Sequence, residues 1–328
     1  MFKPQHIGLI FSKTAIKTAQ NKRNDAVYKD SWMLLKIHLP KNDFELAQLQ
    51  GLRYRFNDDT QSGASTITIL PTLLSAQPIN DTNLIAIIRE SFVVAQCVEL
   101  VRDHNNMTEA LLAQLQASLI ERVKLIDNHV DGETQISHLL WLATLKMAVS
   151  VVLEDEALFN ECVTIYQQTI DEDVRPEGYL PRAINGETAV DNFLNQIRSA
   201  QALTLMAEMA RHAGIDLYAY EKRGVSVLTA TTYPLYYYFF PEKWKWVKEV
   251  YKGGKIVDTE VLEDDDAKQI YRNHAGFLEV LNTQYGTRPL KAIRMILDDL
   301  RPIYDVYGGG ITTLTNGYTE KKRRGWFG

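Results

Sequence analysis

Apolar residues recur at helical spacing along most of this chain, from Asp25 to about Gly286, while strand patterns are scarce. One such series is formed by Trp32, Leu35 and Leu39. Side chains three or four positions apart share one face of a helix, so this spacing predicts amphipathic helices that bury one stripe each. Because no strand pattern alternates with the helices, the sequence argues against a parallel sheet.

The predicted helices are separated by short breaks. Pro40 ends one helix, because proline has no amide hydrogen and restricts the residue before it. Asp131-Gly132 turns the chain between the helices expected at 108–126 and 134–152. This pattern predicts an all-α fold of antiparallel helical hairpins, which either close into a ring or stack into an open solenoid.

The chain has 328 residues, of which 45% are hydrophobic, enough for a sizeable core. We expect one domain over residues 1–316, with an irregular arm at 1–25, and a separate tail at 317–328. The net charge of −5 gives no indication of a nucleic-acid partner. The tail is basic and aromatic over residues 321–327, so a protein partner is one interpretation and an unstructured end is another.

Membrane and export signals are weak. No window appears apolar enough over about 18 residues to span a membrane, and residues 1–12 contain no cleavage site. A native start at Met1 favours the cytoplasm, whereas a removed signal would favour the periplasm or secretion. Cys97 and Cys162 lie within apolar helical patterns and are predicted to be buried thiols.

The sequence contains no serine elbow, nucleotide fingerprint or metal-ligand spacing, so we expect no cofactor and no metal. Hydrolysis by paired carboxylates is disfavoured because few acids accompany the polar residues of the central helices. Elimination from a uronic acid polymer needs other groups, namely a donor to the carboxylate, a base and an acid. Asn, Gln, His and Arg suit the first task, and His, Tyr or Lys the others.

Two stretches offer such groups. His138 and Trp141 are three residues apart on one face of a predicted helix. Asn192, Asn195 and Ser199 form a polar stripe on a later helix, which is of interest if it faces His138. A lone histidine in an apolar helix is more often a satisfied core residue, and a polar stripe is more often a solvent face.

Several motifs, in order along the chain, resemble the alginate lyase family, especially polysaccharide lyase family 5. They are Gly51-Leu52-Arg53-Tyr54-Arg55-Phe56, His138-Leu139-Leu140-Trp141, Asp155-Glu156-Ala157-Leu158-Phe159, Gly178-Tyr179-Leu180-Pro181, Met206-Ala207-Glu208-Met209-Ala210, Gly214-Ile215-Asp216-Leu217-Tyr218 and the stretch from Arg301-Pro302 through Gly308-Gly309 to Leu314. The resemblance implies an incomplete α/α toroid with a long groove, acting on alginate or a related acidic polysaccharide by β-elimination without a metal.

The resemblance also implies roles for single residues. His138 falls on the family's histidine and Trp141 on its substrate-stacking tryptophan, while Ile136 and Ser137 replace two asparagines. The family's tyrosine would fall on Gln196 or Arg198, and the aspartate that follows its Gly-Gly pair is Gly310 here. The scaffold therefore matches better than the catalytic set.

Three hypotheses follow: a polysaccharide lyase with rearranged chemistry, a lyase-like fold that only binds an acidic glycan, and a helical scaffold for protein partners. In the first, His138 is the base and Arg198 or Asn195 binds the carboxylate. The acid then comes from elsewhere in the chain. The predicted catalytic residues are His138, Arg198, Tyr179, Tyr271 and His274, and the predicted substrate-binding residues are Trp141, Asn192, Asn195, Gln196 and Arg301.

Overall fold

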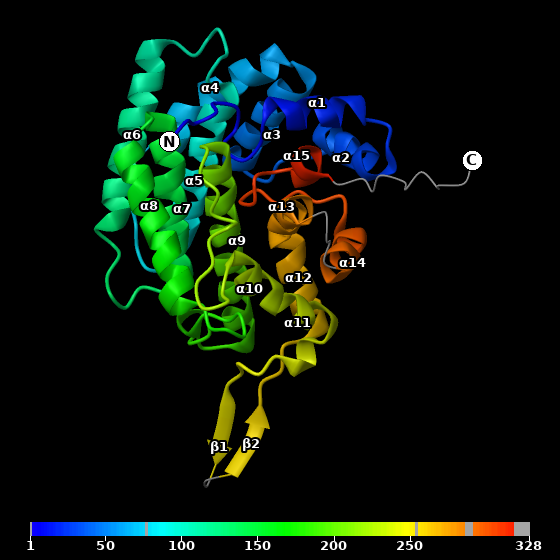
Figure 1. Cartoon of the computed structure of the whole chain (residues 1–328). Helices are drawn as coiled ribbons and strands as arrows, with labels where there is room; N and C mark the ends of the chain where they lie inside the picture. The colour runs from blue at the N-terminus through cyan, green and yellow to red at the C-terminus, as the bar shows by residue number, and fades with distance from the viewer. Residues whose placement is uncertain (1, 76–77, 253–254, 286–290, 318–328) are drawn as a thin grey trace, which may run out of the picture.

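The computed structural model describes residues 2–75, 78–252, 255–285 and 291–317. The fold is all-α, an incomplete α/α toroid of antiparallel helical hairpins, with one small β-hairpin (Figure 1). This confirms the predicted fold class. The elements are α1 (Lys13–Asn21), α2 (Ala26–Ile37), α3 (Asp43–Asn57), α4 (Thr60–Leu73), α5 (Leu84–Val101), α6 (Glu109–Asp127), α7 (Ile136–Leu153), α8 (Glu156–Gln168), η1 (Thr169–Asp173), η2 (Pro181–Ala183), α9 (Ala189–His212), α10 (Val227–Thr232), η3 (Tyr233–Leu235), α11 (Tyr236–Phe239), η4 (Pro241–Lys243), β1 (Glu249–Lys252), β2 (Lys255–Thr259), α12 (Asp264–His274), α13 (Gly276–Gln284), α14 (Lys291–Leu300) and α15 (Thr312–Asn316).

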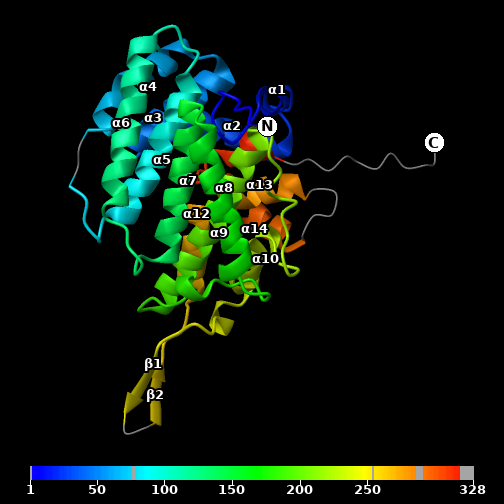
Figure 2. The ribbon, with the colours of Figure 1, turned by 60° about the vertical axis from the view of Figure 1, so that its left-hand side comes forward.

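Helices α3, α5, α7 and α9 pack side by side in chain order and form the inner wall (Figures 1 and 2). Their hairpin partners α4, α6 and α8 lie against them, and α12 and α13 pack on the far side of α9. The C-terminal helix α15 contacts α1, α2 and α13, so the end of the chain returns to its beginning. This arrangement brings side chains from α5, α7, α9 and α12 toward one region.

Helix α7 is apolar nearly all round, and α5 and α9 pack against it on two sides, so its apolar side chains are buried. By length and composition it would also pass as a membrane-crossing helix, so the expectation that no such window exists was wrong. In the structure, 78% of that window is buried inside the protein. The apolar run is accounted for by packing in the centre of the fold.

Two local expectations need correction, and one is confirmed. The arm predicted to be irregular contains α1, whose N-cap Ser12 accepts a hydrogen bond from the amide of Ala15. The helical pattern expected up to about Gly286 is interrupted by the antiparallel hairpin of β1 and β2, which projects from the helical body (Figures 1 and 2). Cys97 and Cys162 are buried free thiols, as predicted. All but the first residue of the tail at 317–328 lies outside the described residues.

Candidate functional site

A buried arginine lies at the centre of the helical wall. Arg89, on α5, is only 4% exposed, and its Nη2 donates hydrogen bonds to Nδ1 of His274 (2.9 Å) and to Oε1 of Gln201 (3.4 Å). Its guanidinium carbon lies 3.8 Å from the ring centroid of Tyr307 and 4.9 Å from that of Trp141. Arg89 therefore joins α5 to α7, α9, α12 and the segment after α14.

The negative charge nearest to this arginine belongs to Asp305, which is fully buried. Its carboxylate accepts hydrogen bonds from Nε2 of Gln201 (2.7 Å) and from the amides of Gly276 (3.0 Å) and Gly308 (2.8 Å). Burial raises the pKa of Asp305 to about 6, against the opposing effects of Arg89 and the amide donors. No ion pair between described residues joins Asp305 to Arg89, although their charges interact.

Two positive groups share this region. Burial, followed by the charge of Arg198, lowers the pKa of Arg89 to about 9. Arg198, on α9, is itself largely buried, which lowers its pKa. Among the described residues no hydrogen bond or ion pair involves the Arg198 guanidinium, and its Nε is buried without a partner. Such a group is suited to receive a carboxylate from outside the chain.

Histidines flank these arginines. His138, on α7, is partly buried, and burial followed by the charge of Arg198 lowers its pKa to about 4. His274, on α12, has a lowered pKa because of burial and then the charges of Arg89 and Arg198. Both imidazoles are therefore neutral at pH 7, and a neutral imidazole accepts protons. Since arginine only donates, Nδ1 of His274 is an acceptor and its proton lies on Nε2.

The polar stripe of α9 does face the start of α7. Oγ of Ser137 donates to Oδ1 of Asn195 over 3.2 Å, and Asn195 is 9% exposed. The amide nitrogen of Asn195 makes no hydrogen bond to the described part of the chain. The structure thus places a free amide donor beside the residue that precedes His138.

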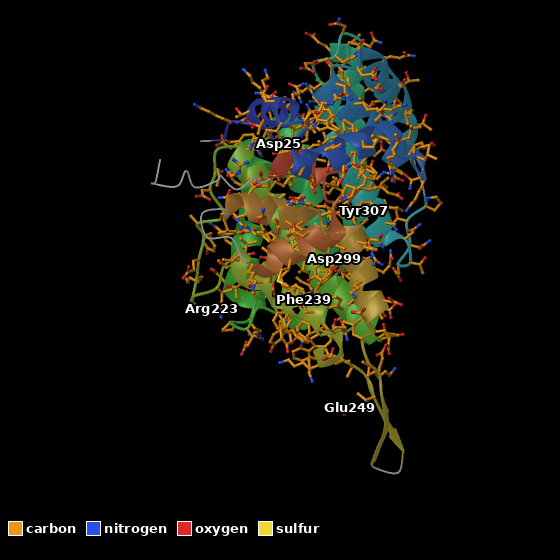
Figure 3. The ribbon with its side chains drawn as sticks, turned by 90° about the vertical axis from the view of Figure 1, so that its right-hand side faces the viewer. Asp25, Arg223, Phe239, Glu249, Asp299 and Tyr307 are labelled. Carbon is orange, nitrogen blue, oxygen red and sulfur yellow. The ribbon has the colours of Figure 1, made fainter. Side chains whose placement is uncertain are left out.

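Part of this cluster lines a cavity of about 320 Å³, and His138, Arg198 and Asn195 are not among the residues that line it. Arg89 and His274 line it from one side, and the segment of Tyr304 and Tyr307 lines it from another. The remaining lining residues come chiefly from the connection between α2 and α3, including His38, Lys41 and Glu45. Tyr307 lies on the face that Figure 3 presents, and burial raises its pKa while Arg89 opposes that effect. Its phenol is therefore protonated at neutral pH.

Two predicted site residues lie in packed surroundings instead. Trp141 is 0% exposed and meets Phe92 edge to face at 5.7 Å between ring centroids, so no face of the indole is open to a sugar. Tyr271 is also 0% exposed and packs against Phe193 and Tyr238. Trp141 was singled out by its spacing from His138, and Tyr271 by its polar neighbours in the sequence. Neither pattern says which side of a helix is open.

Two others hold the fold together. Gln196 accepts a hydrogen bond from the amide of Leu180 (3.1 Å) and thereby fixes the turn that begins at Gly178. Gly178 has φ +106°, and a Cβ there would lie 2.5 Å from a backbone oxygen, so the turn requires glycine. Arg301 pairs with Glu279 through two hydrogen bonds of 2.8 and 2.7 Å and lines neither this cavity nor the next.

The last two predicted residues lie near a second cavity, of about 310 Å³, close to the base of the hairpin. Asn192 lines it, but both ends of its amide are engaged, with the amide of Gly186 (2.6 Å) and the carbonyl of Trp246 (3.1 Å). Tyr179 packs against Trp246 with 4.8 Å between ring centroids. Neither residue has a recorded contact with His138 or Arg198.

The structure therefore places Arg198 within electrostatic reach of His138 and His274, and Asn195 beside Ser137. It adds Arg89 and Tyr307, which the sequence analysis missed. Arg89 had a signal, because it is the only basic residue in the mostly apolar sequence of α5. Tyr307 had none beyond its position before three glycines. Within the described ranges no group of three His, Cys, Asp or Glu side chains is placed to hold a metal ion.

Comparisons with known proteins agree with this architecture. A model of the alginate lyase family matches residues 44–244, more than half of the chain. The chain therefore belongs to the alginate lyase family. The comparison with curated proteins finds no match.

Solved structures show the same fold at low sequence identity. A Tyr-to-Phe variant of alginate lyase A1-III complexed with tetrasaccharide is 17% identical, with a TM-score of 0.70 over 93% of this chain and 95% of that one. Alginate lyase A1-III from Sphingomonas species A1 is 18% identical, with a TM-score of 0.67 over 89% and 78%. An alginate lyase from Bacteroides ovatus is 12% identical, with a TM-score of 0.63 over 94% and 98%.

Proposed function

We propose that this protein is a polysaccharide lyase that cleaves a uronate-containing polymer such as alginate by metal-independent β-elimination. The observation that carries the proposal is a largely buried arginine, Arg198, whose Nε has no partner in the described protein and whose charge acts on the neutral imidazole of His138. Neutralising the sugar carboxylate makes the neighbouring carbon acid easier to deprotonate, and a neutral imidazole can take that proton. Membership of the alginate lyase family and the solved alginate lyase complex with tetrasaccharide support the choice of substrate class.

The proposed reaction divides the work among few groups. Arg198 and the free amide of Asn195 bind the carboxylate of one uronate. His138 removes the proton from C5, and the electron pair of that bond forms the C4–C5 double bond as the C4–O bond breaks. The leaving oxygen takes a proton from an acid, for which the phenol of Tyr307 is the best-placed candidate.

The other candidate acids have weaker support. Tyr271 is enclosed by aromatic rings, and Tyr179 packs beside the second cavity. His274 lines the first cavity, but its Nδ1 is engaged by Arg89, and a neutral imidazole N–H is a far weaker acid than a phenol. We therefore assign His274 to holding Arg89 in place.

The test uses polymannuronate, polyguluronate, glucuronan and hyaluronan, with the absorbance of the unsaturated product as the readout. We expect product from at least one polymer, and a loss of about 10²–10⁴-fold in His138→Ala, which removes the base. Release of no product from any polymer would overturn the proposal.

A second function has one specific observation in its favour. The two positions that resemble the family's paired asparagines hold Ile136, which is buried, and Ser137, whose hydroxyl is bonded to Asn195. A protein that has Ile136 and Ser137 in place of the paired asparagines would, on this second reading, bind an acidic glycan without cleaving it. Titration of the same polymers by calorimetry, with tight binding and no product, would identify this case. A role as a scaffold through residues 318–328 lies outside the described part of the chain.

A further inference from the structure

The second cavity combines features that the proposed reaction does not use. It lies between the segment 184–187, the start of α9 and the segment from Lys245 to Lys248. Trp246 is partly exposed there, and Lys245 and Lys248 are exposed. The family match ends at residue 244, so the segment carrying these side chains lies beyond the matched residues.

The aromatic part of this surface is held in a fixed orientation. Nε1 of Trp246 donates to the hydroxyl of Tyr233 over 2.8 Å, and the Trp246 backbone carbonyl accepts from Asn192. Tyr179 packs on the other side, with 4.8 Å between its ring centroid and that of Trp246. An indole fixed in this way offers a flat apolar surface without a further loss of side-chain entropy on binding.

The two lysines of this surface have no acidic partner among the described residues. Nζ of Lys245 lies 4.9 Å from the ring centroid of Trp246 and 5.8 Å from that of Tyr179. None of the ion pairs between described residues involves Lys245 or Lys248. One carboxylate, that of the exposed Glu187, also lines the cavity and reduces the excess of positive charge.

The surface and the proposed active site share helix α9. Asn192, which holds Trp246, precedes Arg198 by six residues on the same helix, a distance of roughly 9 Å at about 1.5 Å per residue. Asn195 lies between them, one turn from Asn192. A ligand bound at Arg198 must therefore extend beyond one sugar to reach Lys245.

We propose that Tyr179, Lys245, Trp246 and Lys248 form a distal subsite for acidic sugar units of the polymer whose cleavage is proposed above. An acidic sugar presents an apolar ring face and a carboxylate, which match the indole and the two ammonium groups respectively. This inference rests on the proposed function for the identity of the ligand. It predicts that affinity depends on the length of the oligosaccharide.

The experiment measures binding of uronate oligomers, from disaccharide to polymer, by calorimetry. All variants are built on His138→Ala in the full chain, so that no ligand is cleaved. Lys245→Ser/Lys248→Ser removes both charges of the subsite, and Lys222→Ser/Lys243→Ser is the matched control. Lys222 and Lys243 are exposed and line neither cavity.

We expect the subsite variant to bind long oligomers and polymer about tenfold more weakly, to bind the disaccharide with unchanged affinity, and to lose part of the salt dependence of polymer binding. The control should stay within about twofold of its parent. Equal affinities of the subsite variant and its parent at every length, or no binding of any length by the parent, would overturn the subsite. Length-dependent binding together with no product from the wild type would overturn the cleavage and leave the subsite standing.

Discussion

Two largely buried arginines in this protein, Arg301 and Arg198, have opposite surroundings. Arg301 is matched by Glu279, which accepts from both Nε and Nη2 of Arg301 and also from Oγ1 of Thr313 (2.6 Å). Burial alone would lower the pKa of Arg301, but the hydrogen bonds and charge of Glu279 raise it. Arg198 has no such partner, and its pKa is lowered by burial.

The difference separates a structural ion pair from a site that is ready for a ligand. Leaving a buried cation unpaired costs stability, because the charge has lost water without gaining a counter-charge. A fold keeps such a group where a ligand supplies the missing charge. Arg301 was predicted to bind substrate, and its closed pair with Glu279 favours a role in joining α13 to the end of α14 instead.

The largest expected effect comes from breaking the closed pair. Glu279→Ala should lower the free energy of unfolding by about 3–5 kcal/mol, because it leaves Arg301 largely buried without its counter-charge. Urea denaturation followed by circular dichroism measures this. Arg198→Ala is the contrasting variant and should retain nearly the full stability of the wild type. Equal stability losses in the two variants would erase the distinction between the two arginines.

The second effect concerns activity. Arg198→Ala should reduce kcat/KM for the uronate polymer by about 10²–10³-fold, since it removes the group that neutralises the carboxylate as charge develops. Arg198→Lys should recover only part of this, because an ammonium lacks the planar fork of a guanidinium. The matched control Arg301→Lys should leave kcat/KM near that of the wild type at temperatures where it is folded. Unchanged turnover in Arg198→Ala would contradict the assigned role.

The helical periodicity was sufficient to predict the fold class, because amphipathic helices with short connections have few ways to bury their stripes. Periodicity could not separate a ring from a solenoid, since that choice depends on contacts between distant ends, such as α15 with α1 and α2. The hairpin was missed because β1 and β2 are short and pair mainly with each other.

The site was less predictable, for a physical reason that Trp141 and Arg89 illustrate. A helix that is apolar on every side is buried on every side, so the spacing of His138 and Trp141 could not show that Trp141 is fully enclosed and His138 only partly buried. Arg89 lies in a mostly apolar helix and was overlooked, although the only basic residue of such a helix is itself a signal. Tyr307 joins the site only because the segment after α14 folds back over α5, which no local pattern encodes.

The smallest effect is one of pH, and it tests whether Arg198 acts on His138. The folded-state pKa of about 4 lies below the ordinary 6.5, so the unfolded chain binds more protons between these values. The stability due to neutral His138 is therefore fully present above pH 6.5 and is lost as pH falls through about 4. His138 must be neutral to act as the base, so kcat/KM should also fall as pH falls, with the midpoint of this decrease near pH 4.

NMR titration of the His138 imidazole measures the same pKa without turnover. In Arg198→Gln the midpoint should move upward, because one of the two causes of the lowered pKa is removed, while Arg301→Gln should leave it in place. A midpoint near 6.5 in the wild type would mean that His138 is open to water and unaffected by Arg198.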